Sequence, residues 1–94
     1  MGLLPARTAV LNYMSTVEKA DVHQVMEALR SQYGTEKQFT VPLFLEHLMS
    51  LECNGYVEQV SYDLDEQQKL RIFYKINADG LDAVNKYIAA EYKR

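Results

Sequence analysis

The order of hydrophobic and polar residues predicts three helices in the first part of the chain. The first follows Pro5, which suits an opening helical turn, and continues to about Glu18. Its apolar positions recur at helical spacing at Val10, Leu11, Met14 and Val17. Asp21 is a good N-cap for a second helix, which we expect to end at Gly34 in a left-handed conformation. The apolar face of this second helix consists of Val22, Val25, Met26, Leu29 and Tyr33.

A third helix is predicted after a short polar connection. Thr40 is its expected N-cap, and Pro42 suits its first turn. Its apolar face contains Leu45, Leu48 and Leu51. Asn54 and Gly55 end the segment, because Gly55 permits the sharp turn that carries the chain from a helix into a strand.

Two strands and a last helix complete the pattern. Residues 56–64 are rich in β-branched and aromatic side chains, and residues 70–76 alternate between two kinds of side chain. One side carries Leu70, Ile72, Tyr74 and Ile76, and the other carries Lys69, Arg71, Phe73 and Lys75. Polar residues between the two segments predict an antiparallel ribbon with a loose tip. Asn77 can cap a final helix to the C-terminus, with an apolar stripe of Leu81, Val84, Ile88 and Tyr92.

Two motifs are notable in this α+β order of three helices, two strands and a helix. Residues 48–58, LMSLECNGYVE, join the third helix to the first strand, and residues 73–80, FYKINADG, lead from the second strand into the last helix. Together they resemble the winged-helix (winged helix-turn-helix) regulators, in particular the small PadR-like group. The resemblance implies one winged-helix domain over residues 1–94. Its parts would be an N-terminal helix at 1–18, a helix-turn-helix at 21–55, a β wing at 56–76 and a C-terminal helix at 77–94.

Apolar residues on the two terminal helices predict a contact between subunits. The family resemblance implies a homodimer whose outer helices pair and whose third helices enter adjacent major grooves of double-stranded DNA. A domain of 94 residues also has a thin core, so exposed apolar helix faces favour pairing with a second copy. The expected contact residues are Leu4, Val10, Met14, Leu81, Val84, Tyr87, Ile88 and Tyr92.

The charge distribution leaves two functions open. The net charge is −3, and no Lys or Arg lies between Lys37 and Lys69. The same interval contains the carboxylates of Glu46, Glu52, Glu58, Asp63, Asp65 and Glu66. Helices that bind in the major groove usually contact phosphates and guanine through Lys and Arg, so this third helix would be an unusual one. The chain is either a small DNA-binding transcriptional regulator or a winged-helix module that binds a basic or apolar protein partner.

Both hypotheses use the same predicted contact residues on the third helix and the wing. These are Lys37, Thr40, Leu43, Phe44, His47, Ser50, Lys69, Arg71 and Lys75. The positions of the basic side chains distinguish the two functions. If Lys19, Arg30, Lys37, Lys69, Arg71 and Lys75 converge on one side, DNA is favoured, whereas scattering among acids favours a protein partner.

No enzymatic, metal or cofactor chemistry is expected. Cys53 is the only cysteine and lies near a helix C-terminus beside acids, which predicts a partly buried, unreactive thiol. His47 is expected on the surface of the third helix, and the histidines and Cys53 are too few and too far apart to bind a metal. The chain has no Gly-rich phosphate loop, signal peptide or apolar run long enough to cross a bilayer. We therefore expect a cytoplasmic protein that does not associate with membranes.

Overall fold

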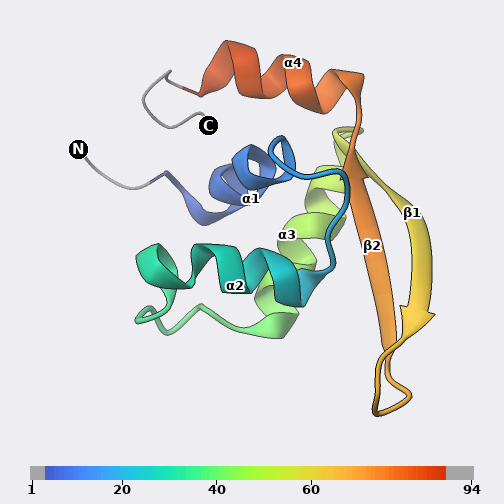
Figure 1. The fold of residues 1–94 in the computed structure, drawn as a ribbon. Helices are drawn as coiled ribbons and strands as arrows, with labels where there is room; N and C mark the ends of the chain where they lie inside the picture. The colour runs from blue at the N-terminus through green and yellow to red at the C-terminus, as the bar shows by residue number, and fades with distance from the viewer. Residues whose placement is uncertain (1–3, 89–94) are drawn as a thin grey trace.

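The structure, a computed structural model, describes residues 4–88 and has the predicted order of elements. Three helices are followed by a two-stranded antiparallel sheet and a last helix (Figure 1). Their bounds are α1 Ala6–Met14, α2 Val22–Tyr33, α3 Val41–Cys53, β1 Val57–Leu64, β2 Leu70–Ile76 and α4 Ala78–Tyr87. This arrangement is a winged helix, with the β1–β2 ribbon as the wing, and it confirms the predicted fold class.

The predicted N-caps all bind the helices that they precede. Asp21 Oδ1 accepts a hydrogen bond from the backbone N–H of Gln24 at 2.8 Å, and the Gln24 side chain accepts one from the N–H of Asp21 at 3.0 Å. Thr40 Oγ1 accepts from the N–H of Leu43, and Asn77 Oδ1 accepts from the N–H of Gly80. Each cap satisfies a helical N–H that has no partner within its own helix, which explains why these boundaries follow from local sequence.

Two helix ends differ from the predictions. The helix α1 stops at Met14 and not at Glu18, because the hydroxyls of Ser15 and Thr16 donate hydrogen bonds to carbonyls of its last turn. The helix α4 ends at Tyr87, and residues 89–94 lie outside the described part of the chain.

The two expected glycine turns have different outcomes. Gly55 has a φ of +80° and turns the chain from α3 into the wing, as predicted. The prediction of a left-handed Gly34 was wrong, because this residue continues the helical conformation with a φ of −63°. Its N–H donates to the carbonyl of Arg30 at 2.9 Å, so the last turn of α2 extends through it.

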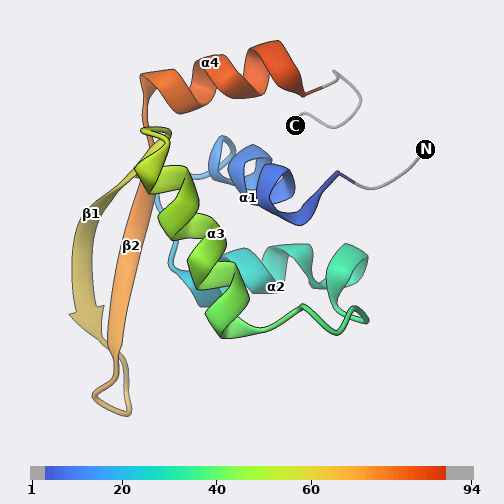
Figure 2. The same cartoon turned by 180° about the vertical axis from the view of Figure 1, so that it is seen from behind.

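The core lies where α1, α2 and α3 meet the root of the wing. In Figures 1 and 2, α1 lies between α2 and α4. Its residues Val10 and Met14 are fully buried, together with Val25 of α2, Leu48 of α3 and Tyr74 of β2. The apolar faces predicted from helical spacing therefore form the core, and α4 covers α1 on the side away from α2.

The wing is joined to the helices by a short additional pairing. The strands pair from Val57 opposite Ile76 to Leu64 opposite Leu70, with a bulge at Val60. Ala20, in the connection between α1 and α2, pairs with Tyr74 of β2 through two backbone hydrogen bonds of 3.0 and 2.9 Å. The ribbon is therefore held at its root by a segment more than fifty residues earlier in the chain.

The tip of the wing is ordered by one carboxylate and is not the loose loop that was predicted. Asp65 Oδ1 accepts hydrogen bonds from the backbone N–H groups of Gln67 at 2.8 Å and Lys69 at 2.9 Å. These backbone donors, the bond from Lys69 above all, lower the pKa of Asp65. Gln68 has a φ of +63°, which completes the turn.

Candidate functional site

The helix α3 presents its outer side to solvent, as a winged-helix binding helix does (Figure 2). Its inner side is buried through Phe44, Leu48 and Leu51. Met49 is 51% exposed, and the remaining side chains of its outer half are exposed or half-buried. Because none of the residues of α3 is basic, this outer side is apolar and acidic.

Phe44 does not belong to the binding surface for which it was predicted. It is only 2% exposed, and its ring packs edge-on against Phe39 and His47 with centroid separations of 5.2 Å in both cases. Leu43 is half-buried, and Thr40 is exposed but has its hydroxyl engaged in the N-cap. The front of α3 therefore offers less apolar surface than the sequence suggested.

His47 is more enclosed than a surface histidine. The residue is half-buried, and both ring nitrogens are buried with no hydrogen-bond partner in the described part of the chain. Burial lowers the pKa of His47 from its ordinary value of 6.5, the positive charge of Arg7 lowers the pKa further, and Glu46 opposes these effects. The neutral imidazole is therefore the form that the folded protein favours.

Acidification should destabilise the protein through His47. The folded-state pKa of His47 is lowered, so on acidification the unfolded chain takes up the proton first. The free energy of unfolding should therefore fall as the pH decreases from about 7 through the unfolded pKa of about 6.5, and the loss is complete below the folded pKa. His47→Gln should remove this component, as measured by urea unfolding at several pH values.

The matched control for this titration is His23→Gln. His23 is the other histidine of the chain and is exposed on α2. The variant removes this imidazole and leaves His47 in place, so the component of the pH dependence that His47 contributes should remain. An identical pH dependence in the wild type and His47→Gln would show that His47 does not couple to folding.

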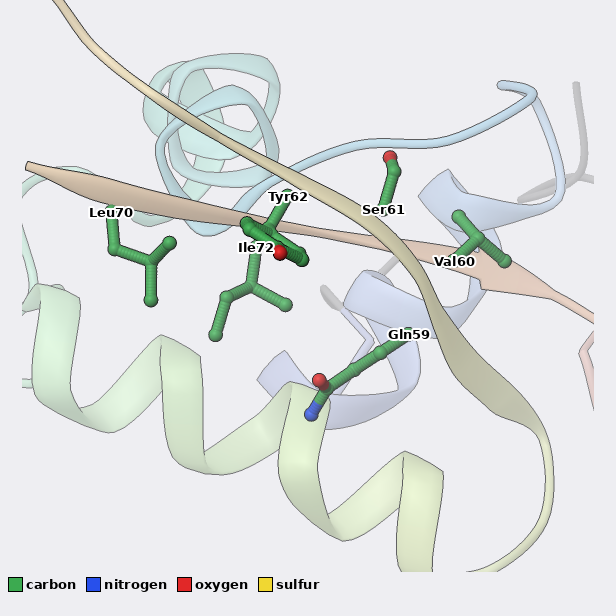
Figure 3. A pocket seen from close by; sticks show the side chains of 6 residues that line it. All are labelled: Gln59, Val60, Ser61, Tyr62, Leu70 and Ile72. Atoms are coloured by element: carbon green, nitrogen blue, oxygen red, sulfur yellow. The ribbon is translucent and has the colours of Figure 1, made fainter.

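The wing has one apolar face, which is directed toward α3. Tyr62 pairs with Ile72 and Leu64 pairs with Leu70, so these four side chains share a face of the ribbon. Figure 3 shows Leu70, Ile72 and Gln59 directed toward α3. They contribute to a groove of about 640 Å³ lined by Gln59, Val60, Ser61, Tyr62, Leu70 and Ile72. The sequence placed Leu70 and Ile72 on this face, but it did not show that they remain open to solvent.

The opposite face of the wing carries the basic residues, and Arg71 among them has an acidic partner. Arg71 donates two hydrogen bonds to Asp63, at 2.7 and 2.8 Å, and this contact raises the pKa of Arg71. The guanidinium of Arg71 and the ammonium of Lys19 also lie over the ring of Phe73, at 5.3 and 5.0 Å from its centroid. The register places Lys75 opposite Glu58. Arg71 and Asp63 therefore form a cross-strand ion pair.

The remaining basic residues do not belong to α3 itself, although Arg7 of α1 lies near enough to His47 to lower its pKa. Arg30 pairs with Glu27 on α2 at 3.1 Å and also lies over the ring of Phe39. Lys37 lies in the connection between α2 and α3, and Lys69 lies at the tip of the wing. These cations therefore lie among acids and aromatic rings at separate places on the described part of the chain.

Four of the residues predicted for a dimer contact belong to the core instead. Val10 and Met14 are fully buried, and Val84 and Ile88 are nearly so, because α4 packs on α1 within the same chain. Leu4 is half-buried, and its carbonyl accepts a hydrogen bond from the hydroxyl of Tyr33. Leu81 and Tyr87 remain exposed on α4. Tyr92 lies outside the described residues.

The other predicted features concern Cys53, metal ions and membranes. Cys53 is exposed, so the prediction of a partly buried thiol was wrong; the end of α3 lies at the surface. Residues 4–88 contain no cluster of three His, Cys, Asp or Glu side chains arranged to hold a metal ion. In the same range, every helix is too short or too polar to cross a membrane.

Comparison with known proteins supports the fold. The sequence matches no protein-family model, and none of the curated proteins is similar to it. Among solved structures, a transcriptional regulator from Clostridium thermocellum is similar over 89% of this chain and 90% of its own, with a TM-score of 0.62 and 15% sequence identity. At this level of identity the likeness shows a shared fold.

Proposed function

We propose that this protein is a transcriptional regulator of the winged-helix class that acts through the surface formed by α3 and the wing. The observation that carries the proposal is the match of nearly the whole chain to the fold of a transcriptional regulator. In the described residues, the outer side of α3 and the apolar face of the wing also lie together and open to solvent. Regulators of this class bind macromolecules through these two elements.

The first form of this function is a DNA-binding homodimer of the PadR-like kind. Lys37 and Lys69 are exposed basic residues that could contact phosphates on either side of α3, and Ser50 is a half-buried polar residue of α3. Leu81 and Tyr87 would contribute to the subunit contact on α4. The fold supports this form, and the acidic charge between residues 37 and 69 opposes it.

DNA binding is tested by titrating the protein with random-sequence duplex DNA from about 50 mM salt upward, since phosphate contacts make the affinity depend steeply on salt. A DNA-binding regulator should show affinity that falls with salt. The combined Lys37→Ala and Lys69→Ala variant should reduce the slope of log K against log salt by about 0.9 for each lost contact. Lys86→Ala, on α4, is the matched control and should leave the slope unchanged. Absence of binding at low salt would contradict the DNA-binding form.

The second form is a winged-helix module that binds another protein. The specific observation in its favour is the placement of charge, because Arg71 and Arg30 are paired with acids and α3 has no basic residue. An apolar and acidic surface suits a protein partner with exposed apolar and basic side chains better than it suits a phosphate backbone. A protein that fails the DNA titration but binds such a partner would act in this second form.

A further inference from the structure

We propose that the apolar face of the wing binds a segment of another protein that combines apolar side chains with Lys or Arg. We call this face the inner wing surface and define it as Tyr62, Leu64, Leu70 and Ile72. The inference rests on the second form of the proposed function and specifies its partner.

The first argument is the amount of apolar side chain that the fold leaves uncovered on one face. Tyr62 is 76% exposed, Leu70 59% and Leu64 56%. Ile72 is half-buried and packs against the hydrophobic core, so the surface is continuous with the interior of the protein. Single exposed apolar residues are ordinary, but a contiguous group on one face of a ribbon marks an interaction site.

The second argument is shape. The groove of about 640 Å³ begins at Gln59, near the root of the wing, and ends at Leu70, near its tip. Its volume lies in the range of about 300–1,000 Å³ that is usual for clefts that bind small molecules, and most of its lining residues are apolar. The two cross-strand pairs form the apolar floor, and Figure 3 shows Gln59 extending toward α3 at one end. An extended or helical segment could place apolar side chains here.

The third argument is the charge around the groove, which selects the partner. Glu52 of α3 accepts a hydrogen bond from the Gln59 side chain, at 3.4 Å, and so lies beside one end of the groove. Asp65 and Glu66 lie next to Leu64 at the other end, where they line an adjoining hollow. Arg71 borders this hollow too, but Asp63 neutralises it, and the two acids Asp65 and Glu66 outnumber Lys69, the other cation at this end. Carboxylates at both ends favour a positively charged segment.

The same acids disfavour a second copy of this chain as the occupant. Two inner wing surfaces facing each other would bring Glu52, Asp65 and Glu66 of both copies together, and the chain has a net charge of −3. Juxtaposed like charges cost several kcal/mol in an interface. A separate basic protein segment satisfies both the apolar floor and the acidic ends.

The test measures binding of two labelled synthetic peptides to the full chain by fluorescence anisotropy. One peptide is amphipathic with Leu and Lys, and the other has Glu in place of every Lys. We expect the Lys peptide to bind more tightly than the Glu peptide. Combined Tyr62→Ser and Leu70→Ser should weaken that binding by about tenfold or more, since removing apolar contacts worth about 1.4 kcal/mol has this effect.

Tyr87→Ser is the matched control for the wing variants. Tyr87 lies on α4 and is 76% exposed, the same fraction as Tyr62, so its loss removes an equal apolar surface elsewhere. This control should bind the Lys peptide like the wild type. Combined Glu52→Gln and Glu66→Gln should weaken binding of the Lys peptide and reduce its salt dependence. If Tyr87→Ser and the wing variant lose the same affinity for the Lys peptide, the proposal is overturned.

Two further results separate this inference from the function on which it rests. If Val41→Ser at the exposed start of α3 abolishes peptide binding while the wing variants bind normally, the inner wing surface is not the site, but a protein-binding module remains. If the wild type and all the variants bind the Lys peptide no more tightly than the Glu peptide, both the site and the protein-binding function are contradicted. If sedimentation shows a wild-type dimer that Tyr62→Ser and Leu70→Ser dissociate, the occupant is a second copy and the proposed partner is wrong.

Discussion

Leu48→Ala is expected to lower the free energy of unfolding by about 2–5 kcal/mol, because the side chain is fully buried and its loss leaves a cavity. Leu48 lies on the inner side of α3, within the core where α3 meets α1 and α2. The loss is measured by urea denaturation of the wild type and the variant. For a domain of this size, a decrease of about 2–5 kcal/mol is a large part of the total free energy of unfolding.

The neighbouring residue supplies the control for this prediction. Met49→Ala changes the next position of the same helix, but Met49 lies on the outer side of α3 and is half exposed. Its effect on the free energy of unfolding should be below about 1 kcal/mol, as is usual for surface positions. Similar losses for the two variants would mean that α3 is rotated relative to the core described above.

Gly80→Ala is expected to destabilise the protein by about 1–3 kcal/mol through overpacking. Gly80 is buried in the first turn of α4, where that helix contacts the segment that enters the wing. A β-carbon at this position would collide with the carbonyl oxygen of Tyr56 and lie 2.5 Å from Cγ1 of Ile76. Because one obstacle is backbone, the clash must be relieved by moving α4. The thermal midpoint should fall accordingly.

Asp82→Ala provides the comparison for Gly80→Ala in the same helix. Asp82 is exposed, so its substitution should change the free energy of unfolding by less than about 0.5 kcal/mol. An unchanged thermal midpoint for Gly80→Ala would show that α4 does not approach the Tyr56 carbonyl closely. If both variants lower the free energy of unfolding, substitutions anywhere in α4 destabilise the protein and the close approach at Gly80 is not the cause.

The elements were predictable from the sequence because their boundaries depend on local chemistry. Asp21, Thr40 and Asn77 cap their helices by contacts with residues three positions later, and such contacts can be inferred from neighbouring residues alone. Gly55 is similar, since its positive φ is a local requirement. The end of α1 was missed because the competing hydroxyls of Ser15 and Thr16 were not weighed against helical periodicity.

The candidate surface was less predictable because it depends on how the elements pack. Helical spacing did not distinguish which apolar residues of α3 face inward, so Phe44 was assigned to the surface although it packs against Phe39. The alternation in β2 could be predicted from the sequence, whereas burial along it could not. Lys19 lies over the ring of Phe73 on one face, while nothing in the described chain covers Leu70 on the other. These differences arise from contacts between residues distant in sequence.

The pairing of Ala20 with Tyr74 has a consequence for how the wing can move. Separating the root of the wing from the helices would break two backbone hydrogen bonds at once, together with the contact of Lys19 with Ser61. The wing root and the connection between α1 and α2 should therefore open and close as one cooperative unit. Asp21, which starts α2, directly follows this connection. A partner that stabilises the wing root would thereby also slow fraying at the start of α2, so the two regions are thermodynamically linked.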